Sequence, residues 1–209
     1  MSGILRGCPV VVAAPSGAGK TSLVRALAEI DPLVRLSVSY TTREPRPGES
    51  DGEHYHFTNS ADFEKLIAAD ALVEHALVHG NYYGTGRDKV EESLNAGFDV
   101  ILEIDWQGAR QVRKLWPDAL TIFVLPPSKE ALLQRLTHRG QDSDAVIARR
   151  LANAKAEIEH YAEFDYLLVN DDFAHSLADL SAVLRAHRQL CSRQSRAHAG
   201  LIQALLKNA

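Results

Sequence analysis

Residues 14–21, with the sequence A-P-S-G-A-G-K-T, lie between two segments of contrasting pattern. An apolar run over 10–14 leads into them, and a helical pattern over 21–29 follows. A strand, a glycine-rich loop and a helix in this order are typical of a phosphate-binding loop. Glycine lets the backbone direct its N–H groups at one point, and the start of a helix favours negative charge. The loop therefore predicts a site for the phosphates of a nucleotide.

Two side chains of this loop have expected roles. Lys20 would reach the β- and γ-phosphates, and the Thr21 hydroxyl would bind a magnesium ion, partly through water. Ala14 replaces the first glycine of the usual pattern G-x-x-x-x-G-K-[ST], whereas the ending G-A-G-K-T is intact. A chance glycine-rich turn before a lysine is the alternative, and the strand-to-helix context disfavours it. The remaining loop residues expected to contact ATP are Pro15, Ser16, Gly17, Ala18 and Gly19.

The composition limits the function classes. The 209 residues are 45% hydrophobic and 24% charged, which fits a globular α/β protein with a sizeable core. A net charge of −4 gives no general attraction to nucleic acid or to an anionic membrane. The two cysteines are far apart and show no metal-ligand spacing, which favours a reducing, cytoplasmic setting. The N-terminal apolar run is too short to span a membrane.

Residues 41–49 form a stiff, charged segment after an alternating pattern over 36–40 that predicts a strand. Two prolines and a glycine exclude regular structure here, and Arg43 and Arg46 are three residues apart. A preorganised pair of guanidinium groups suits a second, dianionic phosphate. An ordinary charged surface loop is the alternative.

Short elements are also expected in the residues that follow. Strand patterns occur at 54–57 and 72–78, a helical pattern at 61–69, and an aromatic turn at 81–86. Glu74 is the one carboxylate within the apolar run 72–78. We therefore expect residues 36–86 to form a small lobe inserted into the phosphate-loop fold.

An alternation of helix and strand resumes after the lobe. A helix is expected at about 88–96 and an apolar strand at 99–105, which ends in acids. Glu103 and Asp105 share one face of that strand at its carboxyl end, where parallel sheets bind ligands and where such proteins hold a magnesium-side carboxylate. Asp105 could equally cap the helix expected over 107–115, and the two roles are compatible.

Two arginine-bearing helices are expected after the strand at 120–125. They cover about 129–139 and 143–161, with a glycine-containing joint between them. Arginines on helices are most often solvated or paired with acids, but here they could also belong to a lid that closes over phosphate. These arginines are Arg135, Arg139, Arg149 and Arg150.

The chain is expected to end in a core strand and helices. The strand covers 166–169, and the helical part has a core stripe of Leu177, Leu180, Leu184 and Cys191. Near its end four arginines are expected to form a solvated face or a contact between the subunits of a homo-oligomer. These four are Arg185, Arg188, Arg193 and Arg196.

Seven stretches together give the chain a resemblance to the guanylate kinases, from about residue 9 to about 206. They occur in family order, and the form with Trp106 is similar to bacterial members. The resemblance implies an ATP:GMP phosphotransferase that makes ADP and GDP from ATP and GMP or dGMP, with Mg²⁺, for purine recycling and GTP supply. The stretches are 15–20, 41–49, 80–84, 104–108, 126–128, 139–140 and 170–172.

The family also implies a phosphate-loop core with a parallel sheet flanked by helices, a GMP-binding lobe and a helical lid. The core would comprise residues 1–35, 87–125 and 163–209, the lobe 36–86, and the lid 126–162. Carried over residue by residue, the GMP site comprises Ser39, Glu74, Thr85 and Asp105 around guanine, with Glu103 beside them, and Arg43, Arg46, Tyr55 and Tyr83 on the phosphate.

The resemblance also implies catalytic roles for Lys20, for Arg46 on the GMP phosphate, and for two lid arginines, Arg139 and Arg150. On the adenine side it places Arg135, Asn170 and Asp171. Glu103 stands where the family more often has aspartate, and its longer arm could still hold a magnesium-bound water.

Three other functions share parts of this pattern. A kinase for another nucleotide would lack the guanine set, and a kinase for a sugar phosphate would lack the inserted lobe. A non-catalytic binding module of the same fold typically lacks the loop lysine and the lid arginines. This sequence has all of these features.

Overall fold

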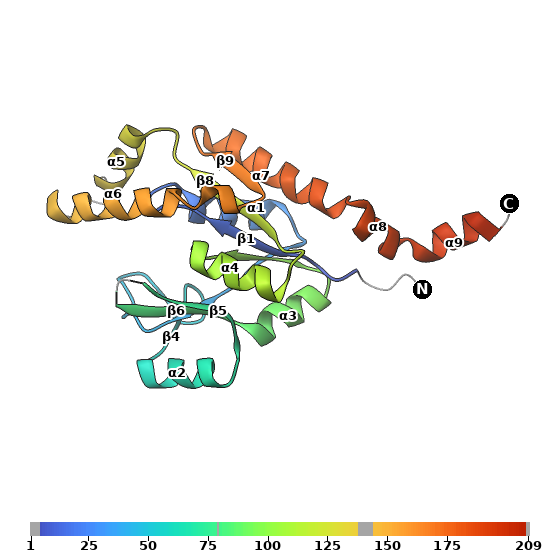
Figure 1. Cartoon of the computed structure of the whole chain (residues 1–209), viewed down its shortest axis with the longest axis horizontal. Coiled ribbons are helices and arrows are strands. Elements are labelled where there is room, and N and C mark those ends of the chain that lie inside the picture. The colour runs from blue at the N-terminus through green and yellow to red at the C-terminus, as the bar shows by residue number, and fades with distance from the viewer. Residues whose placement is uncertain (1–4, 79, 138–143, 208–209) are drawn as a thin grey trace.

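The computed structural model describes residues 5–78, 80–137 and 144–207. A five-stranded sheet lies at its centre, with every neighbouring pair parallel and the order β2-β7-β1-β8-β9. Figure 1 shows this sheet between two layers of helices. The expected α/β fold with a parallel sheet is therefore confirmed. Its strands are β1 (Pro9–Ala13), β2 (Val34–Leu36), β7 (Asp99–Glu103), β8 (Leu120–Leu125) and β9 (Tyr166–Val169).

The central strand β1 shows why the sheet is stable. All five of its residues are buried, and its side chains alternate between two hydrophobic clusters. Val10 and Val12 pack with α1 (Lys20–Ile30) and α7 (Phe173–Arg188) on one face. Val11 packs on the other face with α3 (Arg87–Asn95) and α4 (Trp106–Leu115). A strand buried on both faces is typical of parallel sheets.

A second, four-stranded sheet is built from residues that follow β2. Its order is β4-β3-β6-β5, with α2 (Ser60–Ala68) against it. Figure 1 shows this sheet and α2 below the central sheet; α3 leads from β6 back to β7, and α4 packs against β5. The strands are β3 (Ser39–Thr41), β4 (His56–Phe57), β5 (Leu72–Val78) and β6 (Asn81–Gly86).

The aromatic turn expected at residues 81–86 was a wrong prediction. These residues form β6, which pairs with β5 on one side and β3 on the other. Gly80, directly before β6, has a φ of 81°, in the region that favours glycine. Tyr82 stacks on Phe63, with ring centroids 5.1 Å apart, whereas the next residue, Tyr83, contacts Tyr55. The two tyrosines therefore have different partners, because side chains alternate between the faces of a strand.

Three strand predictions were too long, and the one at 99–105 ends at Glu103. The pattern at 36–40 is divided between β2 and β3, which belong to different sheets. Of the pattern at 54–57, only His56–Phe57 pairs as a strand. The predicted core strand β9 is an edge strand, with Leu168 its only buried residue.

The helices after β8 form a separate projection. They are α5 (Lys129–Thr137) and α6 (Asp144–Ile158), followed by a 3₁₀ turn over Tyr161–Glu163. Leu132 and Leu136 pack with Ala154 in a small cluster of their own. In the described ranges, no helix is apolar over a length that could cross a membrane.

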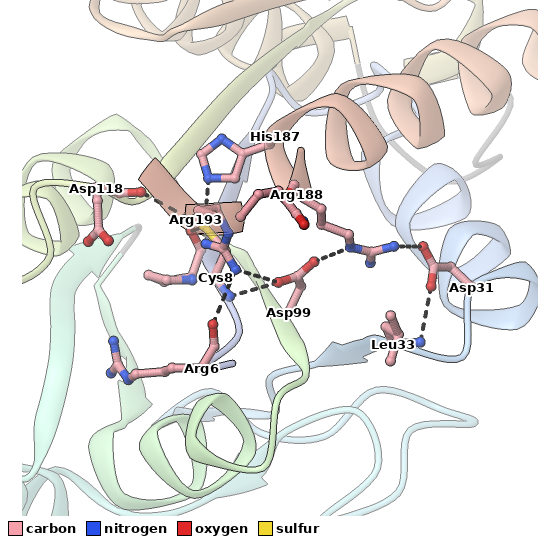
Figure 2. Close-up of polar contacts among 11 residues, drawn as sticks. Arg6, Cys8, Asp31, Leu33, Asp99, Asp118, His187, Arg188 and Arg193 are labelled. Carbon is pink, nitrogen blue, oxygen red and sulfur yellow. Dashed lines mark hydrogen bonds and ion pairs between the residues drawn. The ribbon is translucent and has the colours of Figure 1, made fainter. Parts of the chain in front are cut away.

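An ion-pair cluster attaches the C-terminal helices to the amino end of the sheet (Figure 2). Arg188 lies 2.7 Å from both Asp31 and Asp99, and Arg193 lies 3.9 Å from Asp99. Asp99 also accepts the Cys8 N–H at 2.7 Å, and Cys8 Sγ lies 3.2 Å from His187 Nε2. The expectation of a solvated face was therefore wrong for Arg188 and Arg193, because buried carboxylates need these partners.

The last two helices lie away from the core. α8 (Cys191–Ala197) and α9 (Ala199–Lys207) extend beyond α7 in Figure 1. Leu180 and Leu184 are buried as expected, but Cys191 is exposed at the start of α8. The predicted core stripe ends with α7, because the helix stops at Arg188 and the chain changes direction.

Candidate functional site

A cavity of about 560 Å³ lies between the carboxyl end of the central sheet and the second sheet. The phosphate loop forms one wall, and β5, β3 and β6 contribute the opposite one. Residues far apart in the sequence therefore meet at one site. Those predicted to bind nucleotide are Pro15, Ser16, Gly17, Gly19, Lys20, Thr21, Ser39, Tyr55, Glu74, Tyr83, Glu103, Asp105 and Arg135.

The backbone of the phosphate loop depends on its two glycines. Gly17 and Gly19 both have φ of 92°, in the region that favours glycine. A Cβ atom on Gly19 would lie 2.4 Å from Asn170 Nδ2, so a larger residue cannot replace it without movement. The two glycines therefore set the shape of the loop.

Arg135 and Asn170 support this loop from behind. Asn170 Nδ2 donates to the Ala18 carbonyl at 2.7 Å, and Arg135 Nη1 donates to the same oxygen at 3.2 Å. Arg135 Nη2 also donates to the Asn170 carbonyl at 3.1 Å. Both residues were expected near adenine, and here they connect α5 and the end of β9 to the loop. Asp171 is exposed, and its Oδ1 accepts the Asp172 N–H.

Lys20 and Thr21 begin α1 at the floor of the cavity. Lys20 Nζ lies 3.5 Å from the Ile104 carbonyl, and Thr21 Oγ1 donates to Glu103 Oε2 at 2.8 Å. Burial lowers the pKa of Lys20, and the negative charges of Glu103 and Glu157 oppose this shift. Glu103 therefore lies on the phosphate-loop side of the cavity, next to the hydroxyl predicted to bind magnesium.

Oxygen ligands of the kind that magnesium prefers are present beside the loop. Thr21 and Glu103 supply a hydroxyl and a carboxylate within 2.8 Å of each other. Among the residues with described positions, no group of three or more His, Cys, Asp or Glu side chains is arranged to hold a metal ion. The donor set suits an ion that keeps several waters and binds with phosphate, rather than an all-protein cage.

Glu74, Thr85 and Ser39 form a hydrogen-bonded chain on the opposite wall. Thr85 Oγ1 lies 2.7 Å from Glu74 Oε1 and 3.0 Å from Ser39 Oγ. Burial raises the pKa of Glu74 to about 7, and the nearby charge of Asp105 acts in the same direction. A Cβ atom on Gly108 would lie 2.8 Å from Glu74 Oε2, so only glycine leaves room for the carboxylate.

Asp105 caps a helix, as predicted, and lies at the cavity where a ligand-binding role was predicted. Its Oδ1 accepts the Gly108 N–H at 2.9 Å and so caps α4. It also lines the cavity next to Glu103. The carboxylate is fixed by the helix start, and its charge acts on Glu74.

The charged segment after β3 is held by an internal ion pair. Both Glu49 carboxylate oxygens lie 2.9 Å from Arg43 Nη2, and Glu49 also accepts the Arg46 N–H at 2.8 Å. Tyr55 and Tyr83 contact each other at 6.0 Å between ring centroids and line the cavity. Arg43 and Arg46 are not among the lining residues, and Arg46 is exposed.

The region predicted to form a lid supplies one residue that the sequence did not single out. Arg139 lies outside the described residues, and Arg150 is half-buried on α6. Glu157, near the end of α6, lines the cavity beside Ser16 and Lys20. A glutamate in an amphipathic helix gives no sequence signal of such a position.

A profile of the family described as guanylate kinase matches residues 6–187. The chain belongs to the guanylate kinase family. It is 55% identical over 203 residues to the guanylate kinase of Escherichia coli (strain K12), which covers 96% of this chain and 98% of that protein. The same values hold for the guanylate kinase of Salmonella paratyphi A.

A solved structure supports the family assignment. The crystal structure of guanylate kinase from Anaplasma phagocytophilum superimposes with a TM-score of 0.76, 32% identity, and 90% coverage of each chain. The resemblance inferred from seven short stretches is thus confirmed over nearly the whole length. Two walls with different chemistry, around one cavity, are what a guanylate kinase needs for two nucleotides.

Proposed function

We propose that this guanylate kinase transfers the γ-phosphate of ATP to GMP or dGMP, making ADP and GDP or dGDP. The arrangement of the cavity carries the proposal: a phosphate loop with a half-buried lysine lies opposite the buried carboxylate of Glu74 in a cavity of about 560 Å³. The loop would hold the ATP phosphates, and the opposite wall would hold guanine. The cellular role would be purine recycling and GTP supply, in the cytoplasm.

Guanine recognition follows from hydrogen-bond donors. Guanine presents N–H groups at N1 and N2, which need acceptors such as the carboxylates of Glu74 and Asp105. Adenine has an acceptor at N1 and would leave these buried oxygens without a partner. A site that hydrogen-bonds its substrate can have a kcat/KM for such an analogue that is roughly 10⁴-fold lower. We assign Ser39 and Thr85 to the same surface, because they orient Glu74.

The GMP phosphate would bind where Tyr55 and Tyr83 line the cavity. The Arg43 guanidinium lies 5.5 Å from the Tyr55 ring centroid and forms an ion pair with Glu49. We propose that Arg43 and Arg46 move onto the phosphate when residues 36–86 close over GMP.

Residues 126–162 would close over ATP and bring Arg139 and Arg150 to the transferring phosphoryl group. An arginine that reaches the transferring phosphoryl group can raise kcat on the order of 10³-fold or more.

Thr21 and Glu103 would hold magnesium with the ATP phosphates, Glu103 through a bound water. The ion would neutralise part of the triphosphate charge. Lys20 adds a further positive charge from within the loop, and the loop N–H groups orient the phosphates. Alignment and charge neutralisation supply most of the rate in phosphoryl transfer, so these residues need form no covalent bond.

A coupled assay of ADP release tests the proposal. GMP, dGMP, AMP and UMP are compared as acceptors with ATP and Mg²⁺ at saturating donor. We expect turnover with GMP and dGMP and at least 10³-fold lower kcat/KM with AMP and UMP. Comparable rates with AMP would rule out the guanine assignment, and turnover with none of the four would reject the kinase activity.

A further inference from the structure

Glu157 places a negative charge inside the cavity where the proposed function puts the ATP phosphates. It lies in the last turn of α6 and lines the cavity with Ser16, Gly17 and Lys20. Its Oε2 atom is buried and has no hydrogen-bond partner among the residues that the structure describes. A buried carboxylate oxygen without a partner is costly, so the position needs an explanation.

The surroundings of Glu157 are those of a bound anion. The backbone N–H of Ser16, a member of the phosphate loop, interacts with its carboxylate, and the positive charge of Lys20 acts on it. Burial nevertheless raises the pKa of Glu157, and the negative charge of Asp105 adds to this effect. The carboxylate therefore uses the same N–H group and the same cation that a phosphate would use.

The backbone beside Glu157 is fixed to the core. His160 stacks on Trp106 of α4 with ring centroids 3.7 Å apart, and its Nδ1 lies 2.7 Å from Glu163 Oε1. Arg110 of α4 donates to both oxygens of the same carboxylate. The base of α6 is thus held near the loop by α4, so the Glu157 side chain can leave the loop by rotation whether or not the rest of residues 126–162 closes.

We propose that Glu157 is a positioning residue that occupies the phosphate loop between turnovers and is displaced by the phosphates of the donor. It satisfies the Ser16 N–H and balances Lys20 while the loop holds no nucleotide. Its like charge weakens the binding of ATP and ADP, which favours release of the product ADP. This inference rests on the proposed role of residues 14–21 as the donor-phosphate site.

The test is calorimetric titration of the full chain with inorganic tripolyphosphate and with ADP, both with Mg²⁺. Glu157→Gln keeps the size and a hydrogen-bond acceptor but removes the charge. We expect both ligands to bind roughly three- to tenfold more tightly, as for loss of one nearby like charge. Affinity for GMP should not change. Glu159→Gln, at an exposed position two residues later, is the matched control and should leave all three affinities unchanged.

Glu157→Asp keeps the charge but withdraws the carboxylate from the Ser16 N–H, so its affinity for tripolyphosphate should lie between those of the parent chain and Glu157→Gln. It also serves if the glutamine variant does not fold, because unchanged or weaker binding by the aspartate variant would contradict occupation of the loop by Glu157. Unchanged or weaker binding by Glu157→Gln overturns the role of Glu157 and leaves the donor site intact. If the parent chain binds neither tripolyphosphate nor ADP, the donor-site proposal itself is wrong, and this inference with it.

Discussion

At the scale of single residues, the ionisation of Glu74 connects pH to nucleotide binding. Burial raises its pKa to about 7, so the free protein changes from mostly protonated to mostly ionised as pH rises from 6 to 8. Guanine N–H groups need the ionised form, and binding therefore favours loss of the proton. We expect the affinity for GMP to rise roughly tenfold over this range, as calorimetry at several pH values can measure.

The phosphate of GMP titrates near the lower end of the same range, so a variant must separate the two effects. Glu74→Gln keeps the contribution of the GMP phosphate and removes that of the carboxyl group. Its affinity for GMP should be lower at every pH and should rise less steeply between pH 6 and 8. An equal slope in the two proteins would show that Glu74 does not titrate in this range.

Lys20 provides the second prediction at this scale. Removing the amine in Lys20→Ala takes away the positive charge expected on the transferring phosphoryl group, so kcat should fall by about 10³-fold or more. GMP should still bind, because Glu74 and Thr85 lie on the other wall. Lys20 lowers the pKa of Glu74 by its charge, so GMP affinity is best compared at pH 8.5. Loss of GMP binding at that pH, in a folded variant, would contradict the two-wall arrangement.

At the scale of elements, the ion-pair cluster around Arg188 determines how α7 is attached. The Asp31 and Asp99 side chains are only 12% and 6% exposed, and both lie 2.7 Å from the guanidinium group. Arg188→Ala would leave two buried carboxylates short of a partner. We expect the free energy of unfolding in urea to fall by about 2–4 kcal/mol. Exposed Arg185→Ala is the matched control and should cost less than about 0.5 kcal/mol.

This cluster lies at the amino end of β7, whereas the cavity is at its carboxyl end. The KM values for ATP and GMP should therefore stay within about twofold of the parent values in folded Arg188→Ala. A changed KM with unchanged stability would mean that α7 acts on the site rather than on the core.

Elements with a strong local pattern could be predicted from the sequence. The apolar runs at Leu72–Val78 and Leu120–Leu125 have the predicted ends, and the helix of the phosphate loop is one residue longer at each end than expected. Residues 81–86 were misassigned because glycine and asparagine favour turns locally, while pairing with β3 and β5 decides the outcome.

Within the site, side chains next to a strand end or a glycine pattern could be found from sequence, as Lys20 and Asp105 show, and Glu74 could be found as the one carboxylate within an apolar run. Contacts between distant segments could not. The carboxylate that binds Arg43 was present in the sequence as Glu49, but nothing in the local pattern shows the pairing. Likewise, the approach of Glu157 to Ser16 depends on how α6 packs against the core.

At the scale of the whole molecule, one cavity bordered by a loop, a second sheet and two projecting helices implies two ligands bound side by side. Each ligand stabilises the folded state by about 2.7 kcal/mol at 100 times its Kd. For GMP and an ATP analogue with a non-transferable γ-phosphate, separate sites predict a joint stabilisation of about 5.4 kcal/mol. Overlapping sites predict only about 3.1 kcal/mol at the same concentrations. Urea unfolding with each ligand alone and with both distinguishes these values.

Closure of residues 36–86 and 126–162 over the two ligands would add to this sum. Each ligand would then order groups that the other also contacts, and the joint stabilisation should exceed about 5.4 kcal/mol by on the order of 1 kcal/mol or more. The excess is a coupling free energy, so GMP should tighten binding of the analogue by the same factor as the analogue tightens binding of GMP. Additive stabilisation with no mutual effect would leave two independent sites and argue against coupled closure. Calorimetric titration of each ligand into the complex with the other measures both factors directly.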